Sequence, residues 1–388
     1  MIYLDHNATS PLRPGAKAAM AEALGDTGNP SSVHGSGRKA RARIEMARES
    51  LARLAGCDPS GIIFTSGGSE ANALAIRGAL QAAADAGNRI TRLMISAIEH
   101  DSVRGNAQVL VETAPGLRLQ EIPVSRDGKV DIEALRNMII HGKGRVFVSV
   151  MAANNETGVV QDVSQIGDVL KQECGAGALF HVDAVQTLGR KTLPFSSSGA
   201  SYMTVSAHKL GGPQGAGALI VGPEAPLSAQ HAGGGQESGR RAGTENVAAI
   251  AGFGAIAADP AGLDVHADAL GRLRDRFEAE LKRVAPDVVV FGETVARIPG
   301  TSNFAIPGLN SETAVIALDL DGIAVSSGAA CSSGKVKPSH VLAAMGVPDS
   351  LARCGIRVSF GWSSRESDVD AAIDSLSRLL ARRRALAA

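Results

Sequence analysis

The chain has 388 residues, of which 44% are hydrophobic, and lysine plus arginine equal aspartate plus glutamate at 39 each. Such a chain can bury a large core and is long enough for two domains, which argues against a disordered protein. With no net charge, it has no basic field that would draw it to nucleic acid or to an anionic membrane. We therefore expect small molecules or proteins as partners.

The chain shows no sign of a targeting or membrane segment. Met1 leads directly into IYLDHNATS, without a basic segment and an apolar run, and nowhere are eighteen consecutive residues apolar. The cysteines Cys57, Cys174, Cys331 and Cys354 have neither CxxC nor Cys/His spacing, which argues against a zinc site and a disulfide framework. We expect a cytoplasmic protein with free thiols and no intrinsic metal site.

Helix-like and strand-like segments alternate over the first two thirds of the chain. The helical segment RKARARIEMARESLARLAG precedes the apolar run IIFTS, and GGSEANALAIRGAL returns to helical spacing. Further runs of strand length are RLMIS, VFVSVM, ALFHVD, YMTVS and AGALIV. This alternation predicts a mostly parallel sheet covered by helices on both faces.

The pattern changes from about His266. The amphipathic segment HADALGRLRDRFEAELKRVA precedes the strand-like runs DVVVFG, TSNFAIPG, GIAVSSG and IRVSFG, and ESDVDAAIDSLSRLLARRR predicts a closing helix. We expect a large α/β domain over residues 15–260. A smaller α+β domain would combine residues 1–14 and 261–388.

The segment FTSGGSEAN predicts a strand that ends directly before a helix. Free backbone N–H groups and the positive end of the helix dipole would make an anion cradle at Gly68, and the Ser69 hydroxyl adds a donor. An isolated SGGS is equally compatible with a glycine turn that binds nothing, so both interpretations stay open.

Asp183 closes the apolar run in ALFHVDAVQ. A carboxylate at the carboxyl end of a parallel strand faces the crevice in which α/β proteins bind ligands, where it can hold a protonated ring nitrogen. Taken alone, Asp183 is more simply explained as a cap of the following turn.

Lys209 follows the predicted strand in SYMTVSAHKLGGPQG, with Ser206 and His208 beside it as donors for an anion. A lysine at the interior end of a strand is costly unless it is paired, exposed or covalently engaged, and a Schiff base to an aldehyde cofactor removes that cost. Taken alone, Lys209 also fits a surface lysine that snorkels from a loop.

Together, these segments supply an anion cradle, a carboxylate for a ring nitrogen and a lysine, which are the parts of a pyridoxal phosphate site. His100, in ISAIEH, would stack on the ring, although a lone histidine is more often a hydrogen-bonded structural residue.

Eight ordered motifs carry a family resemblance: DHNAT, GNPSSVH, FTSGGSEAN, NNETG, HVDAVQ, SAHKLGGPQG, GGGQESGRRAGTEN and SSGAACSSG. In this order, over essentially the whole chain, they resemble the cysteine desulfurases. These are class V aminotransferase-like, fold-type I pyridoxal phosphate enzymes, and the long cysteine loop resembles the NifS/IscS branch. The resemblance implies a large domain with a mostly parallel seven-stranded sheet and a smaller α+β domain.

The resemblance also implies roles at the matching positions. Lys209 would form the Schiff base, Asp183 would contact the pyridine nitrogen, Gln186 the ring hydroxyl oxygen, and His100 would lie over the ring. The phosphate would be held by Gly68, Ser69, Ser206, Ala207 and His208, and by Thr244 from the other subunit of a homodimer. Asn155 and Arg357 would hold cofactor and substrate carboxylate; a structural arginine on a strand is the alternative for Arg357.

Cys331 lies in the Gly/Ser-rich stretch SSGAACSSGKVKPSH, within a loop of about residues 326–338. The resemblance implies that its thiolate takes sulfur from L-cysteine, leaving L-alanine and an enzyme persulfide, and a flexible loop suits a group that must then deliver sulfur to a partner. The resemblance also implies that Cys331 can transiently contact a nascent iron–sulfur cluster. Cys57, Cys174 and Cys354 are more simply packing or loop residues.

We therefore expect a homodimeric sulfurtransferase that supplies iron–sulfur cluster assembly or other thio-cofactor pathways. Alternatives are a selenocysteine lyase, a lyase that releases free sulfide, and a catalytically silent sulfur carrier. The sequence departs from the family pattern at Gln214, Ser238 and Trp362, and it ends at ARRRALAA without the longer tail through which housekeeping members dock a scaffold. The choice of sulfur acceptor stays open.

Overall fold

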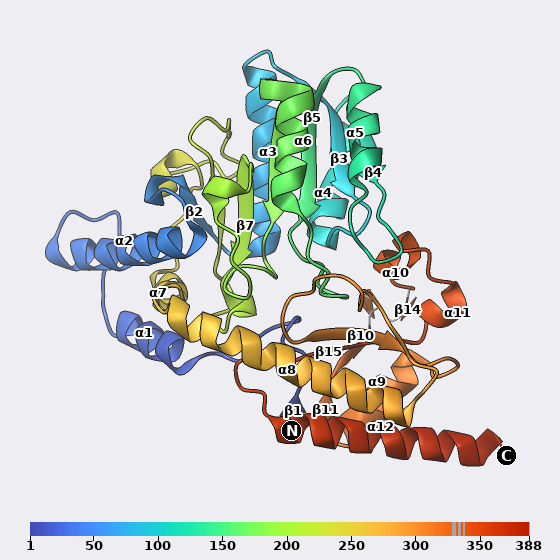
Figure 1. The fold of residues 1–388 in the computed structure, drawn as a ribbon. Helices are drawn as coiled ribbons and strands as arrows, with labels where there is room; N and C mark the ends of the chain where they lie inside the picture. The colour runs from blue at the N-terminus through green and yellow to red at the C-terminus, as the bar shows by residue number, and fades with distance from the viewer. Residues whose placement is uncertain (328–330, 333–334, 337, 388) are drawn as a thin grey trace.

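The computed structural model describes residues 1–327, 331–332, 335–336 and 338–387, without the side chains of residues 176, 264–266, 331–332, 335–336 and 386–387. A seven-stranded sheet forms the upper part of the molecule in Figure 1, in the order β2-β8-β7-β6-β5-β3-β4. Its strands are β2 (Ile62–Thr65), β3 (Ile90–Ser96), β4 (Arg118–Ile122), β5 (Arg145–Met151), β6 (Ala178–Asp183), β7 (Tyr202–Ser206) and β8 (Gly217–Val221). Only β8 runs against its neighbours, so the predicted mostly parallel sheet is confirmed.

Both faces of this sheet are covered by helices, as expected for buried parallel strands. Helices α2 (Gly35–Ala55), α5 (Ile132–Ile140), α6 (Val163–Cys174) and α7 (Val247–Ala257) cover one face, while α3 (Gly68–Asp85) and α4 (Asp101–Thr113) cover the other. Alternate residues of each strand point to opposite faces, so Ile62 and Phe64 join the first core and Ile63 the second. Helix α1 (Pro14–Leu24) packs on α7.

A second, antiparallel sheet has the order β12-β15-β10-β9. Its strands are β9 (Val289–Val290), β10 (Thr301–Ala305), β12 (Ser326–Ser327) and β15 (Gly355–Ser359). Helices α8 (Pro260–Val284) and α12 (Glu366–Ala387), which lie side by side in Figure 1, and α9 (Ser311–Leu320) bury their apolar faces in its core. The predicted change to an α+β pattern is thus seen, whereas the bounds of the two domains stay a prediction.

The cysteine segment contains a short hairpin of β13 (Cys331–Ser332) and β14 (Lys335–Val336), followed by α10 (His340–Ala344) and α11 (Asp349–Ala352). The side chain of Cys331 lies outside the part of the chain that the structure describes.

The N-terminal segment connects the two sheets. Strand β1 (Ile2–Tyr3) pairs in parallel with β11 (Ile323–Ala324), beside the small sheet. The backbone N–H of His6 then donates to the carbonyl of Ser359 at 3.1 Å, and that of Ser10 donates to the carbonyl of His208 at 2.8 Å. Residues 5–10 therefore run from the small sheet to the edge of the large one.

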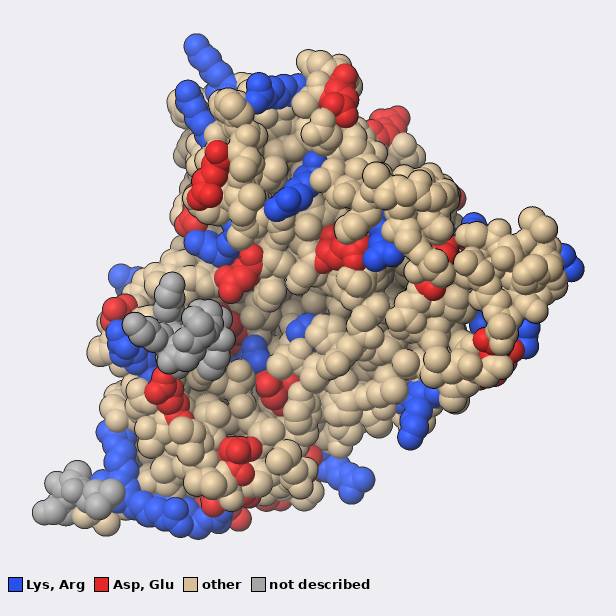
Figure 2. Space-filling view, turned by 180° about the vertical axis from the view of Figure 1, so that it is seen from behind, with Lys and Arg blue, Asp and Glu red and all other residues tan. Residues whose placement is uncertain are grey.

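Acidic and basic side chains are interspersed over the face shown in Figure 2, in keeping with their equal numbers in the sequence. Among the described residues, no single helix is long and apolar enough to cross a membrane; α7 and α8 meet the length and composition test only when taken together, across a 74° bend.

Candidate active site

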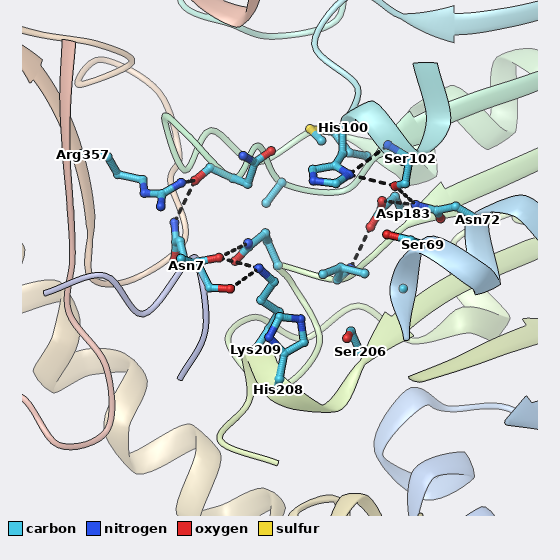
Figure 3. Close-up of a pocket in the computed structure, with 17 residues that line it drawn as sticks. Asn7, Ser69, Asn72, His100, Ser102, Asp183, Ser206, His208, Lys209 and Arg357 are labelled. Atoms are coloured by element: carbon cyan, nitrogen blue, oxygen red, sulfur yellow. Dashed lines mark hydrogen bonds between the residues drawn. The ribbon is translucent and has the colours of Figure 1, made fainter. Parts of the chain in front are cut away.

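A cavity of about 380 Å³ lies where the strands of the large sheet end (Figure 3). Strands β2, β3, β5, β6 and β7 point the same way, so the residues that follow them meet at one edge, where open α/β sheets bind ligands. The predicted residues that line the cavity are Gly68, Ser69, His100, Asn155, Asp183, Gln186, Ser206, His208, Lys209 and Arg357. The topology thus brings together residues spread over nearly 300 positions of sequence.

One end of the cavity is suited to an anion. Helix α3 begins at Gly68, so its first backbone N–H groups and the positive end of its dipole lie at the cavity. A Cβ on Gly68 would lie 2.9 Å from Val185 Cγ2, so any larger residue here would force Val185 to shift. The buried Oγ of Ser206 has no hydrogen-bond partner among the described residues. A buried hydroxyl without a partner at a helix N-terminus fits an oxyanion ligand.

His208 lies at the same end. Its Nδ1 is 3.1 Å from Thr9 Oγ1, and burial, with the nearby charges of Lys209 and Arg190, lowers the pKa of its imidazole to about 4. His208 is therefore neutral near pH 7 and acts there through a hydrogen bond and not through a charge.

Asp183 ends β6, and its carboxylate is held by two donors. Asn72 Nδ2 donates to Oδ2 at 2.8 Å, and the backbone N–H of Val185 donates to Oδ1 at 3.0 Å. The second contact is the turn cap that sequence reasoning offered as the alternative role. Because Asp183 also lines the cavity and forms no ion pair with any described residue, both roles are compatible.

Lys209 projects into the cavity from the 3₁₀ turn Ala207–Lys209. Its Nζ donates to the backbone carbonyls of Asn7 and Ala8, each at 2.7 Å. Burial lowers the pKa of this amine to about 8, helped by the cations Arg190 and Arg357. A substantial fraction of Lys209 is therefore neutral near pH 8 and available as a nucleophile or base.

His100 is the N-cap of α4 and lies at the opposite wall. Its Nδ1 accepts from the backbone N–H of Ser102 at 3.1 Å and lies 2.8 Å from Ser102 Oγ. Asn72 Nδ2 reaches the same hydroxyl at 2.8 Å, so it links His100 to Asp183. These bonds fix the exposed ring of His100 at the wall of the cavity.

Arg357 enters from β15 of the small sheet. Nη1 donates to the carbonyl of Asn155 at 3.0 Å and Nη2 to Asp5 Oδ1 at 2.6 Å, while its buried Nε has no partner among the described residues. The ion pair with Asp5 orients the planar guanidinium at the cavity. A guanidinium with a spare donor is suited to a carboxylate ligand.

Three predicted residues are not placed at the cavity. Ala207 is buried behind it, and Thr244 is exposed on the surface. The side chain of Cys331 is not among those described.

Sequence reasoning missed part of the lining: Asn7, Ala8, Asn72, Ser102, Met151, Ala153 and Val185. Only Asn72 left a readable signal, because it follows Gly68 by four residues on the same helix and so faces the same way. The motif DHNAT supports the family resemblance. Its local sequence pattern, however, gives no sign that the backbone carbonyls of Asn7 and Ala8 accept hydrogen bonds from Lys209.

The three departures from the family pattern lie outside the cavity lining. Gln214 and Ser238 are exposed. Trp362 Nε1 donates to the carbonyl of Pro11 at 2.9 Å, and the Arg13 guanidinium lies 5.7 Å from the centre of its ring. Trp362 thus helps to hold the end of the N-terminal segment.

Within the described residues, no three His, Cys, Asp or Glu side chains lie close enough together to hold a metal ion.

Comparisons with known proteins agree with this geometry. Residues 2–372 match the family Aminotransferase class-V. The chain is 40% identical to an IscS-like cysteine desulfurase of Mycobacterium tuberculosis, over 99% of this chain and 97% of that protein. It is 41% identical to a cysteine desulfurase of Cereibacter sphaeroides, over the same shares.

A solved structure supports the same assignment. The X-ray structure of a NifS-like protein from Rickettsia africae superposes with a TM-score of 0.87 at 35% identity, covering 98% of this chain and 99% of that one. The chain therefore belongs to the class-V aminotransferase family and, within it, to the cysteine desulfurases.

Proposed function

We propose that this protein removes sulfur from L-cysteine with the help of pyridoxal phosphate, producing L-alanine and a persulfide on Cys331. The family is one of pyridoxal phosphate enzymes. The observation that supports the assignment to this cavity is that Lys209, Asp183 and the start of α3 at Gly68 face one space.

The residues present fit this cofactor. The phosphate would bind at the start of α3, where Ser69 and the unpartnered Oγ of Ser206 offer donors. Lys209 would hold the aldehyde carbon through Nζ, Asp183 the ring nitrogen, and Gln186 the ring hydroxyl oxygen. Further contacts would come from His100 against the ring, from Asn155, and from Ala207 and His208 near the phosphate.

The substrate would lie between the cofactor and the small sheet. Arg357 would bind its carboxylate with the donors that face the cavity. When bound, pyridoxal phosphate withdraws electrons from the α-carbon of the attached amino acid and so labilises the bond from the β-carbon to sulfur. Lys209, with a pKa of about 8, would take and return the α-proton at Nζ.

Sulfur removal requires an acceptor, which we assign to Cys331. Its thiolate forms a bond to the substrate sulfur, the bond between that sulfur and the β-carbon breaks, and the electron pair stays on carbon. Protonation of that carbon completes the methyl group of alanine. One thiol and one cysteine thus become one persulfide and one alanine, without an external oxidant.

Assembly and partners follow from the same proposal. Thr244 is exposed and lies three residues after Arg241, which pairs with Glu70 in the first turn of α3; we propose that Thr244 completes the phosphate site of a second copy in a homodimer. The persulfide would pass to a sulfur-acceptor protein such as an iron–sulfur scaffold, with Cys331 as the transient contact to a nascent cluster. We keep a cytoplasmic location as a prediction.

A single-turnover assay with L-cysteine tests the proposal. It follows the visible spectrum of the cofactor, the release of alanine and the mass of the Cys331 peptide. We expect one alanine per active site and a mass gain of one sulfur atom on Cys331. Lys209→Ala should lose both products, and Cys331→Ala should lose the persulfide and turnover but keep the cofactor spectrum.

Cys57→Ala is the matched control, because burial raises the pKa of Cys57 to about 11 and this thiol lies away from the cavity. It should behave as wild type. Full activity of Cys331→Ala with free sulfide as the product would assign the chain to the lyases instead. Failure of the wild type to bind pyridoxal phosphate would overturn the proposal.

A further inference from the structure

Arg190 lies beside the cavity, outside its lining, and has no role in the proposed chemistry. It follows the HVDAVQ motif, in the stretch QTLGRKT. Its Nη1 donates to Gln186 Oε1 at 3.0 Å and to Asn7 Oδ1 at 2.6 Å. Its Nη2 donates to the carbonyls of Lys209 at 2.9 Å and His6 at 3.3 Å. One guanidinium therefore joins three segments around the site, namely residues 6–7, the turn at Gln186 and the turn at Lys209.

All four acceptors of Arg190 are neutral oxygens. Among the described residues it forms no ion pair, in contrast to Arg357, which is paired with Asp5. Burial, together with the charge of Arg357, lowers the pKa of Arg190 to about 10, so it remains a cation near pH 7. Its positive field is not cancelled by an adjacent carboxylate and acts on its neighbours.

The first neighbour is the side-chain amide of Gln186. Arginine can only donate and a carbonyl can only accept, so Oε1 must face Arg190 and Nε2 must face the carbonyl of Asn7, 3.0 Å away. Gln186 is buried and lines the cavity. The second hydrogen on Nε2 is therefore left to donate to an acceptor atom of a ligand in the cavity. If the amide were flipped, its oxygen would face the ligand instead.

The second neighbour is Lys209. Arg190 is the largest charge effect that lowers the pKa of Lys209, after burial itself. Arg357 adds to it, and His208 is neutral near pH 7. Asp5 and Asp183 act in the opposite direction. Because Arg190 also holds the backbone carbonyl of Lys209, its effect combines position and charge.

We propose that Arg190 is a positioning residue that orients the Gln186 amide as a donor toward the cofactor and disfavours protonation of the Lys209 amine. The inference rests on the proposed function for the identity of the cofactor, but its effect on Lys209 is a property of the protein alone.

The experiment compares Arg190→Gln, which removes the charge, with Arg190→Lys, which keeps the charge but loses the two-pronged donor geometry. Arg297→Lys is the matched control, because Arg297 is also largely buried and forms a two-pronged pair with Glu278, at 2.6 and 2.9 Å, away from the cavity. Thermal unfolding of each variant reports general destabilisation.

Two measurements distinguish positioning from a merely structural role. In the cofactor-free protein, the rate of Lys209 acetylation between pH 6 and 10, read by peptide mass spectrometry, gives the pKa of its amine. Titration of the same protein with pyridoxal phosphate gives the cofactor dissociation constant. We expect Arg190→Gln to raise the Lys209 pKa by roughly one unit, because a nearby like charge is removed.

Arg190→Lys should keep the Lys209 pKa near that of wild type but weaken cofactor binding by about tenfold, through the lost orientation of Gln186. Arg297→Lys should change neither value. An unchanged Lys209 pKa in Arg190→Gln, or wild-type cofactor affinity in Arg190→Lys, would refute the inference. If wild type itself does not bind the cofactor, the proposed function fails, whereas the acetylation profile still tests Arg190.

Discussion

The two ends of the cavity are built in different ways. At the large sheet, Ser69, Asp183 and Lys209 lie at or just beyond the ends of strands whose common direction brings them together. At the small sheet, Arg357 is fixed by Asp5, a residue 352 positions away in the sequence. The first end is thus a consequence of a regular topology. The second depends on individual long-range contacts.

The ends also differ in how their charges are satisfied. Arg357 has an ion-pair partner in Asp5, whereas Asp183 and Lys209 form no ion pairs among the described residues. In the proposed function, the charged groups at the large sheet hold the cofactor. In the same proposal, the guanidinium of Arg357, oriented by Asp5, binds the substrate at the other end. Variants should accordingly affect cofactor at one end and substrate at the other.

The largest effect should come from Asp183→Asn, at the large sheet. An amide cannot stabilise a protonated ring nitrogen by charge, so we expect kcat to fall by about 10²- to 10⁴-fold with an altered cofactor spectrum. Steady-state alanine production and absorption spectra measure this. Asp162→Asn, which alters an exposed helix cap outside the cavity, serves as the control. Unchanged kcat in Asp183→Asn would contradict the assigned role.

Arg357→Lys tests the other end. Loss of the guanidinium fork should raise the KM for L-cysteine by about 10- to 100-fold, since a charge-assisted hydrogen bond contributes about 1.5–3 kcal/mol. Cofactor affinity should stay unchanged, which titration of the cofactor-free protein would check. A loss of cofactor binding with an unaltered KM would show that the two ends are not separate in function.

Asp5→Asn should have a smaller effect at the same end. Asparagine keeps an oxygen for Arg357 Nη2 but loses the charge, and Nη1 keeps its bond to the carbonyl of Asn155. We expect the KM to rise by about three- to tenfold, with kcat changed less than twofold. Initial rates over a range of L-cysteine concentrations measure this. A KM equal to that of wild type would show that Asp5 does not position the guanidinium.

The smallest expected effect is on the pH dependence of the free energy of unfolding, through Glu99, which follows β3. Glu99 is fully buried and accepts from Ser96 Oγ and from the N–H of Met151; burial, with the charge of Asp183, raises its pKa from 4.5 to about 8. The folded protein therefore binds this proton more tightly than the unfolded chain. The resulting stability is present below about pH 4.5 and is lost as the pH rises to about 8.

Glu99→Gln removes this ionisation. We expect its Tm, relative to wild type, to be higher at pH 8 than at pH 5 by a few degrees, measured on cofactor-free protein by calorimetry. In the exposed control Glu112→Gln, the difference from wild type should be the same at both pH values. A Glu99→Gln difference that does not change with pH would mean that Glu99 is ionised in the folded state.

The same contrast explains how much the sequence could predict. Six strands of the large sheet were predicted from apolar runs bounded by glycine turns. Each of these strands can be recognised from its own residues and those directly beside it in the sequence. Strand β4, with the sequence RLQEI, was missed because it lies at an edge and is half exposed, so it carries charged residues.

For the site, residues that follow strands were predicted, since strand direction alone brings them together. The carbonyls of Asn7 and Ala8, which hold Lys209, were not predicted. A backbone acceptor has no side-chain signature, and the pairing of β1 with β11 over more than 300 residues leaves no periodic pattern. The roles assigned to Thr244 and Cys331 stay predictions.

The course of the N-terminal segment also bears on how the protein is made. Its first residues leave the ribosome at the start of synthesis, yet their partners at residues 322–324 and 355–359 emerge at the end. The large sheet, which is complete by Val221, can assemble while the rest is still being translated. Residues 2–6 therefore cannot form these pairings until translation is almost complete, and the end of the cavity at Arg357 is the last part of the cavity to form.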